Sequence, residues 1–289
     1  MIRRVAIVGT GLIGASLGLA LRRAGFIGEI AGIDASSVEA EEAVRRGAVD
    51  TAAGVLDGLS VCCEADVIVL AVPVLGIMDW LGRLAAVLGP QQLVTDVGST
   101  KLSICNVAEH RFNGPGQAGF LPGHPMAGKE SGGAALADAS LFGGAMWLFT
   151  PIAQETDLTA AWRQWVVRLG CRTLDLEPAH HDRICAWVSH LPQMVSTAMA
   201  AMFADEFAQA PELAEEFAAI GGRALREMTR LGASPYSMWR DVAMTNTEAV
   251  AATLFALEQR LAHIRENLKT PELREEFAKA NAFRSERQS

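Results

Sequence analysis

Three glycines at fixed spacing after a short apolar run constrain the fold of this chain more than any other feature. The run Val5–Val8 is followed by Gly9, Gly11 and Gly14, and an amphipathic stretch comes next. A strand, a Gly-x-Gly-x-x-Gly turn and a helix in this order are typical of the first unit of a dinucleotide-binding domain. Gly9 would permit the tight turn, Gly11 would let the backbone approach a pyrophosphate, and Gly14 would let helix and strand pack closely.

The residues around this turn indicate NAD as the cofactor. The N–H groups where the helix begins, at Leu12 and Ile13, would face the phosphates. Asp34 ends the next expected strand, where a carboxylate can accept hydrogen bonds from the ribose hydroxyls and repel a 2′-phosphate. Ala71 and Val72 end a third apolar run, at the edge where the nicotinamide half would cross. The alternative is a glycine-rich loop that serves packing alone.

Strand and helix patterns alternate up to about residue 176 and then stop. Further strands are expected at 67–71, 93–96, 119–121, 146–149 and 172–174, several of them apolar at every position. Beyond Glu177-Pro178 the β-branched runs vanish and the sequence indicates helices alone. We therefore expect an α/β protein. Residues 1–176 form a Rossmann-type, doubly wound, mostly parallel sheet that binds NAD, and residues 177–289 form an all-helical substrate and dimerisation domain.

The composition excludes several classes of protein. Half of the 289 residues are hydrophobic, and the formal net charge of −8 comes without any basic block, so we expect no nucleic-acid partner. The apolar N-terminal stretch is interrupted by glycines, which argues against a signal peptide or a membrane span. The five cysteines are scattered, with no CxxC and no histidine at metal-ligand spacing. This pattern favours reduced thiols in the cytoplasm and predicts no metal site.

Apolar residues recur at alternating steps of four and three in the last long helical stretch, from Val250 to Leu268. This spacing is typical of a coiled-coil seam. It favours a helix packed across a homodimer interface, and the alternative is a helix that covers the core of its own domain.

Four polar residues are candidates for chemistry. His124 lies between glycine and proline after the strand at 119–121, and an imidazole there can act as a general base. Ser99 can share its proton network or orient the nicotinamide, or it can cap the next helix. His190 lies in an apolar helix, where a core histidine is the simpler reading. Arg230 is either a surface residue or a carboxylate clamp.

A set of motifs in fixed order carries a family resemblance. They are Gly9-x-Gly-Leu-Ile-Gly14-x-Ser16, Asp96-Val-Gly-Ser-Thr-Lys101, His124-Pro-Met-Ala-Gly128 with Glu130, His181-Asp182, Ser189-His-Leu-Pro192, and Met228-Thr-Arg230 with Met238-Trp-Arg-Asp241. Together they resemble the prephenate dehydrogenase family of tyrosine biosynthesis, over nearly the whole chain.

The resemblance implies NAD-dependent oxidative decarboxylation of prephenate to 4-hydroxyphenylpyruvate by a homodimer joined through its helical halves, with no metal. It assigns the role of base to His124, the support of that histidine and the nicotinamide to Ser99, and a substrate carboxylate to Arg230. His190 and Glu130 are implied as further substrate-binding residues.

Two positions depart from the family pattern. Gln193 stands where some members have a histidine facing the substrate side chain, which leaves an arogenate or dual-specificity cyclohexadienyl dehydrogenase open as an alternative. Lys129 replaces a smaller polar residue, and we expect it to point to water. A dinucleotide-binding module without catalysis is the remaining alternative.

Overall fold

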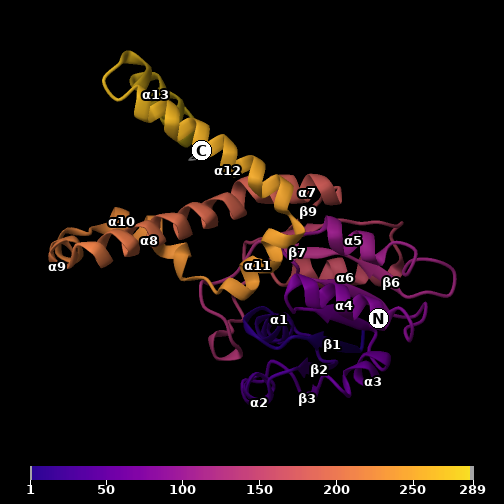
Figure 1. The fold of residues 1–289 in the computed structure, drawn as a ribbon. Coiled ribbons are helices and arrows are strands. Elements are labelled where there is room, and N and C mark those ends of the chain that lie inside the picture. Colours follow the sequence, from indigo (N-terminus) through magenta and orange to yellow (C-terminus); the bar gives the residue numbers. More distant parts are fainter. Residues whose placement is uncertain (1, 287–289) are drawn as a thin grey trace.

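The computed structural model describes residues 2–286 and divides into an α/β body and a helical arm (Figure 1). The body contains a six-stranded, all-parallel sheet in the order β3-β2-β1-β4-β5-β6. Its strands are β1 (Arg4–Val8), β2 (Glu29–Asp34), β3 (Thr51–Gly54), β4 (Val67–Leu70), β5 (Leu93–Asp96) and β6 (Gly119–Leu121). The expected doubly wound α/β fold is confirmed.

Helices cover both faces of this sheet. They are α1 (Leu12–Arg23), α2 (Ser37–Arg45), α3 (Gly58–Cys63), α4 (Val74–Leu84), α5 (Leu102–Ala108) and α6 (Asp157–Arg168). Successive side chains of a strand point to opposite faces, so Val67 and Val69 of β4 join one core while Ile68 and Leu70 join the other. Double burial explains why this strand is apolar at every position.

A second, three-stranded sheet continues from the edge of the first. Strand β7 (Gly123–Pro125) pairs antiparallel with β8 (Met146–Phe149), which pairs parallel with β9 (Arg172–Asp175). The runs at 146–149 and 172–174 are strands as expected, but they belong to this sheet and not to the parallel one. Pro122 separates β6 from β7, and its carbonyl accepts a hydrogen bond from Thr150 at 3.1 Å. Proline has no N–H to continue a ladder, so the chain changes sheet there.

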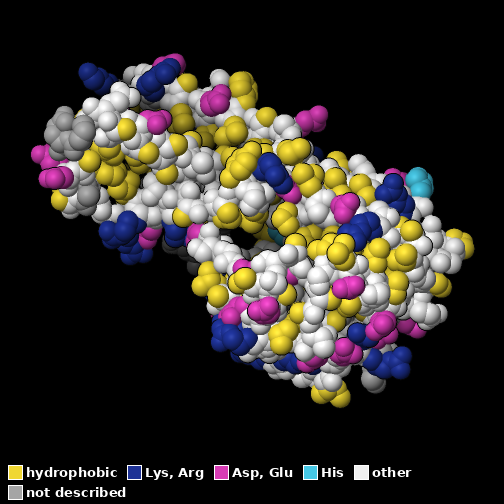
Figure 2. Space-filling model, turned by 60° about the horizontal axis from the view of Figure 1, so that its bottom comes forward, with side chains coloured by type: hydrophobic (Ala, Val, Ile, Leu, Met, Phe, Trp, Pro, Cys, Tyr) yellow, Lys and Arg dark blue, Asp and Glu magenta, His cyan; other side chains and the backbone are white. Residues whose placement is uncertain are grey.

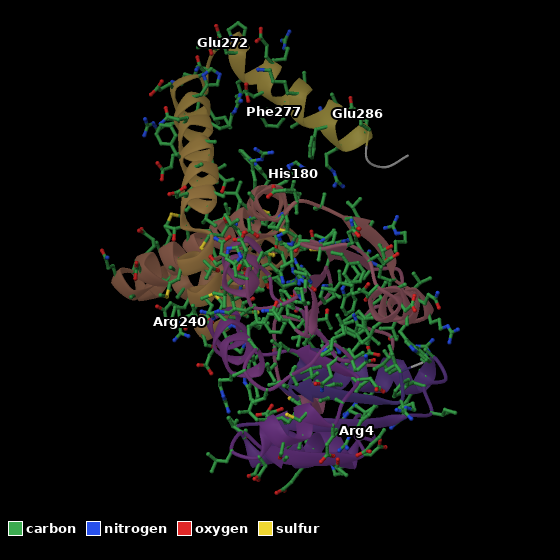
Figure 3. The ribbon with its side chains drawn as sticks, turned by 90° about the vertical axis from the view of Figure 1, so that its right-hand side faces the viewer. Arg4, His180, Arg240, Glu272, Phe277 and Glu286 are labelled. Atoms are coloured by element: carbon green, nitrogen blue, oxygen red, sulfur yellow. The ribbon has the colours of Figure 1, made fainter. Side chains whose placement is uncertain are left out.

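The remainder is helical. It comprises α7 (Pro178–Cys185), a π-helical turn (Ala186–His190), α8 (Leu191–Gln209), α9 (Pro211–Ile220), α10 (Arg223–Thr229), a 3₁₀ turn (Arg230–Ala233), α11 (Tyr236–Thr245), α12 (Thr247–Glu266) and α13 (Pro271–Ser285). Helices α12 and α13 project beyond the body (Figures 1 and 3). Arg260 on α12 donates a hydrogen bond to Glu276 on α13 at 2.8 Å. In residues 2–286 we find no helix with both the length and the apolar character that crossing a bilayer requires.

The expected seam helix is shorter than the pattern indicated. Helix α12 ends at Glu266, so Leu268 lies in the turn before α13. Val250 at its start is buried, whereas Leu261 and Leu268 are 55% and 60% exposed. The beginning of the pattern therefore packs within the chain, and its far end faces outward.

Candidate active site

The glycine turn between β1 and α1 is built as its sequence predicts. Gly9 has a φ of +92°, and a Cβ there would lie 2.4 Å from the carbonyl oxygen of Ala71. At Gly14 a Cβ would lie 1.9 Å from the carbonyl oxygen of Gly9, whereas at Gly11 it would meet no described atom within 4 Å. Backbone atoms therefore fill the space beside Gly9 and Gly14, whereas the space beside Gly11 is free of described atoms. Helix α1 begins there, so an anion can approach its backbone N–H groups.

Asp34 stands at the carboxyl end of β2 beside a cavity of about 530 Å³. Its carboxylate accepts hydrogen bonds from the backbone N–H of Thr10 at 2.7 Å and of Ser36 at 2.9 Å. Arg45 also lines the cavity, but Glu42 on the same helix binds its guanidinium, with Nε at 2.7 Å. The cavity thus presents a carboxylate and a neutralised arginine, which suits a ribose with free hydroxyls better than one that carries a phosphate.

A buried ion pair fixes the start of β7 at the carboxyl edge of the parallel sheet. Lys101 Nζ pairs with Asp96, the last residue of β5, and donates to the carbonyl oxygen of Gly123 at 2.8 Å. The Asp96 carboxylate also accepts from the N–H of Gly98 at 2.8 Å and of Gly123 at 3.2 Å. Lys101 and Asp96 are both fully buried. This pair therefore holds the residue preceding His124 against the end of β5.

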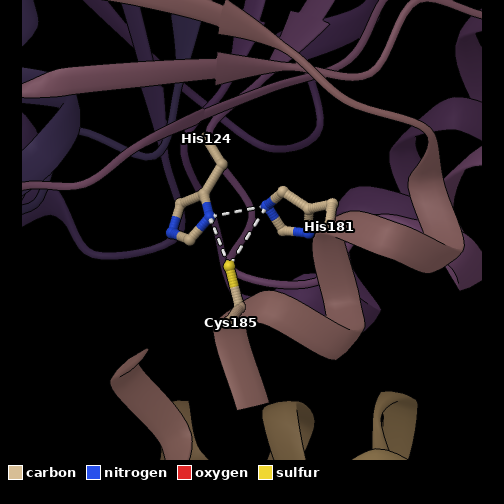
Figure 4. Close-up of side chains that lie close together, drawn as sticks. All are labelled: His124, His181 and Cys185. Atoms are coloured by element: carbon tan, nitrogen blue, oxygen red, sulfur yellow. Dashed lines mark hydrogen bonds between the residues drawn. The ribbon is translucent and has the colours of Figure 1, made fainter. Parts of the chain in front are cut away.

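His124 continues into a chain of hydrogen bonds that reaches the helical part. Its Nδ1 lies 2.9 Å from Nε2 of His181 on α7 (Figure 4). Nδ1 of His181 in turn lies 2.8 Å from Oδ1 of Asp182. The ionised carboxylate can only accept, so His181 carries its proton on Nδ1 and accepts through Nε2. His124 is then the donor through Nδ1, which leaves its Nε2 with a free lone pair. This is the arrangement that a general base requires.

Burial keeps these imidazoles neutral. Burial, reinforced by the neighbouring His181, Lys101 and His190, holds the pKa of His124 well below its ordinary value of 6.5. Burial also lowers the pKa of His181, although the hydrogen bond to Asp182 opposes the shift. His124 is therefore deprotonated at neutral pH, which is the state that a general base must have.

Asp182 also joins the two parts of the chain. Its two carboxylate oxygens accept the N–H groups of Lys101 at 2.7 Å and of Leu102 at 3.0 Å, where α5 begins. The cap of this helix thus comes from α7 and not from Ser99 or Thr100. Ser99 itself is half-buried, and among residues 2–286 it makes no hydrogen bond with His124. Its support of that histidine stays a prediction.

His190 is a fully buried histidine with one ring nitrogen unpartnered. Its Nδ1 lies 3.2 Å from the amide nitrogen of Asn246, and its ring meets Trp239 edge-on at 5.9 Å. Its Nε2 is buried with no hydrogen-bond partner in the described part of the chain. Burial lowers its pKa to about 4. The surroundings of His190 are those expected of a core histidine. Contact between its unpartnered Nε2 and the substrate stays a prediction.

The residues expected around the substrate carboxylates are partly engaged with one another. Arg230, at the start of the 3₁₀ turn, forms an ion pair with Glu130 in the loop after β7. The buried amide of Gln193 donates to the carbonyl oxygen of Leu231 at 2.7 Å and accepts from Ser234 at 3.2 Å. Gln193 thus holds the turn that carries Arg230. Lys129 donates to the carbonyl oxygen of Leu136 at 2.9 Å instead of pointing only to water.

The sequence pattern left several of these residues without a role. His181 and Cys185 lie four positions apart on α7 and meet His124, so the prediction that no cysteine lies at metal-ligand spacing from a histidine is wrong. The spacing was visible in the sequence, but nothing there showed that His124 would join them. Lys101 and Asp96 belong to a sequence motif, but the motif does not show that the two side chains form a buried pair, because their burial depends on the tertiary fold.

Both parts of the chain match models of a known protein family. Residues 17–170 match the family model "Prephenate dehydrogenase, nucleotide-binding domain", and residues 177–281 match "Prephenate dehydrogenase, dimerization domain". A prephenate dehydrogenase of Lactococcus lactis is 33% identical over 85% of this chain, and the match spans 66% of that relative's length.

Two solved structures are similar over nearly the full chain. The prephenate dehydrogenase of Aquifex aeolicus, in complex with hydroxyphenyl propionate and NAD+, has a TM-score of 0.84 and 28% identity, covering 99% of this chain and 98% of that one. The arogenate dehydrogenase of Synechocystis has a TM-score of 0.75 and 31% identity, covering 98% and 99%. The family models, the curated relative and these structures agree with the motifs and the fold: the chain belongs to the prephenate dehydrogenase family.

Proposed function

We propose that this chain catalyses the NAD-dependent oxidative decarboxylation of prephenate to 4-hydroxyphenylpyruvate. The proposal rests most on one observation, the Asp182–His181–His124 chain that leaves Nε2 of His124 as an acceptor. The open glycine turn and the cavity beside Asp34 fit NAD, and they lie at the same edge of the sheet as His124.

His124 supplies the base. NAD, when bound, supplies the acceptor for the hydride that leaves the carbinol carbon of the ring. Nε2 of His124 takes the proton of the ring hydroxyl as that hydride departs, and a base in such a position contributes about 10²–10⁴-fold to the rate. The dienone so formed is a vinylogous β-keto acid, and it loses carbon dioxide because the ring then becomes aromatic. No residue has to supply a second base.

Arg230 supplies the anchor for a substrate carboxylate. Because Arg230 pairs with Glu130, it would exchange the carboxylate of Glu130 for a carboxylate of the substrate when the substrate binds. Gln193 acts here through the turn at Leu231 and Ser234, because both ends of its amide are occupied. Ser99 and His190 complete the proposed site, next to the nicotinamide and the substrate.

The active form in this proposal is a cytoplasmic homodimer. Residues 1–176 serve as the nucleotide-binding domain and 177–289 as the substrate and dimerisation domain. Large apolar side chains are exposed on the helices, including Met202 at 58%, Ile220 at 81% and Phe255 at 61%. Figure 2 displays such yellow patches over the helical part of the molecule. A partner copy would remove these side chains from water.

Arogenate is the second candidate substrate. It differs from prephenate in carrying an amino acid where prephenate has a keto acid, and the similar Synechocystis structure is that of an arogenate dehydrogenase. Because the amide of Gln193 is engaged within the protein, it offers no free group that selects between the two side chains.

A paired turnover assay tests the proposal. The purified protein is given prephenate or arogenate, each with NAD or NADP, and reduced cofactor is followed by absorbance. We expect the highest kcat/KM with prephenate and NAD. An equal or higher kcat/KM with arogenate would instead establish the second candidate, and absence of turnover with all four pairs would indicate a binding module.

A further inference from the structure

Three metal-binding atoms converge beside the base. Nδ1 of His124 lies 2.9 Å from Nε2 of His181 and 4.0 Å from Sγ of Cys185, and that sulfur lies 3.5 Å from Nε2 of His181 (Figure 4). All three side chains are buried. Imidazole nitrogen and cysteine sulfur are both ligand types that zinc binds in proteins.

The triangle has nearly the size that a tetrahedral zinc ion requires. Zn–N bonds of about 2.0–2.1 Å and a Zn–S bond of about 2.3 Å give edges of roughly 3.4 Å between nitrogens and 3.6 Å between nitrogen and sulfur. The observed edges of 2.9, 3.5 and 4.0 Å differ from these by about half an ångström at most. The two nitrogens face each other across a hydrogen bond, so binding a metal requires both rings to turn until their lone pairs meet at one point.

The surroundings already orient one of the ligands. Oδ1 of Asp182 lies 2.8 Å from Nδ1 of His181, which fixes the proton on that nitrogen and directs the lone pair of Nε2 toward the triangle. A carboxylate behind a ligating histidine is the usual outer partner in zinc sites. The space-filling view shows a hollow between the two parts of the molecule (Figure 2).

We propose that His124, His181 and Cys185 form an inhibitory site for zinc or a similar thiophilic divalent cation. The metal takes the lone pairs of His124 Nδ1 and His181 Nε2 and the thiolate of Cys185. The thiol proton is released to solvent, and the proton that His124 carries on Nδ1 moves to its Nε2. The nitrogen needed as the base is then protonated, so the bound metal prevents proton abstraction. Metal binding depends on the triangle alone, whereas its effect on turnover rests on the function proposed above.

Direct binding tests the site without reference to activity. The chelator-free protein is titrated with Co²⁺ and followed by visible spectroscopy, and with Zn²⁺ in competition with a chromogenic chelator. We expect one ion per chain and a thiolate-to-cobalt absorption band. Cys185→Ser removes the sulfur ligand, so it should abolish that band and weaken zinc binding by at least about tenfold.

Two cysteine variants serve as controls. Cys171→Ser changes a buried thiol elsewhere, and Cys63→Ser changes an exposed thiol that could bind metal by chance. Both should bind like the unaltered protein. Failure of the unaltered protein to bind metal, or equal binding by Cys185→Ser, would overturn the site.

Turnover is measured in parallel at increasing zinc concentrations, starting from one ion per chain. We expect zinc to suppress prephenate oxidation in the unaltered protein and in both controls, with at least tenfold more zinc needed for Cys185→Ser. Zinc that binds through Cys185 yet leaves turnover unchanged would refute the inhibitory role. Cobalt binding in a protein that oxidises neither prephenate nor arogenate would contradict the proposed function and leave the site itself supported.

Discussion

Nδ1 of His124 lies 2.9 Å from Nε2 of His181, although the two residues are 57 positions apart and belong to different parts of the chain. This single contact determines which nitrogen of His124 is available to a substrate. It also places one buried imidazole against another, so that protonating either would put a charge beside its neighbour.

The pH dependence of turnover follows from this contact. A base works only when deprotonated, that is, at a pH above its pKa, and burial holds the pKa of His124 well below 6.5. We therefore expect kcat/KM to stay level as the pH falls from 8 to about 6.5 and to decline only below that pH. A pH profile of kcat/KM for prephenate at saturating NAD measures this. An acid limb at or above pH 6.5 would show that His124 is not the neutral base described.

Replacing the base should affect the chemical step alone. His124→Asn keeps a side chain of similar size but no basic nitrogen, and we expect kcat to fall by about 10²–10⁴-fold. NAD binding, measured by fluorescence titration, should stay within about twofold, because the glycine turn and Asp34 are untouched. His110→Asn, at a side chain that is 90% exposed, is the matched control. If His124→Asn retained full kcat, another group would have to be the base.

Cofactor choice should depend on Asp34. Its carboxylate stands at the cavity where the adenosine ribose is proposed to bind, and Asp34→Ala removes both the acceptor and the repulsion of a 2′-phosphate. We expect the ratio of kcat/KM for NAD to that for NADP to fall by about tenfold or more, which corresponds to at least about 1.4 kcal/mol. Glu41→Ala changes another acidic residue that lines the cavity and should leave the ratio unchanged. The same ratio in both variants would contradict the ribose assignment.

Substrate affinity should depend on Arg230. Arg230→Gln removes the guanidinium that pairs with Glu130, and losing a charged hydrogen bond of about 1.5–3 kcal/mol should raise the KM for prephenate by roughly 10–100-fold. The effect on kcat should be smaller. Arg226→Gln, at an exposed site one helical turn earlier, should change neither constant. An unaltered KM in Arg230→Gln would mean that the residue has a structural role only.

The sequence predicts those parts of the fold whose signal is local. The glycine turn, the apolar run Val5–Val8 of β1 and the wholly apolar strand β4 are evident in the sequence, because backbone geometry and double burial each restrict the residue types allowed. Strands β3 (Thr-Ala-Ala-Gly) and β7 (Gly-His-Pro) are not, because they contain few strand-forming residues and exist through pairing with β2 and β8.

The sequence predicts which residues belong to the site, but it does not predict the hydrogen bonds that connect them. His124 and Arg230 could be selected from the chemistry of their side chains. The contacts that His181 and Asp182 make with His124 and Lys101 join segments 57 and 81 positions apart, and no local pattern encodes them. Gln193 shows the converse: its position suggested a substrate contact, whereas the fold occupies its amide with Leu231 and Ser234.

The buried pair of Lys101 and Asp96 gives a prediction for stability. Both side chains are fully buried, and removing one partner leaves the other charge without compensation in a medium of low polarity. We expect Lys101→Met to lower the free energy of unfolding by about 3–5 kcal/mol in urea denaturation. The double variant Lys101→Met, Asp96→Asn should recover part of this loss, because it also removes the unpaired carboxylate. Arg45→Met, which breaks the exposed pair with Glu42, is the matched control and should change stability little. If Lys101→Met unfolded like the control, the pair would not hold Gly123 in place, and the position of His124 would depend on the pairing of β7 with β8 and on its contact with His181.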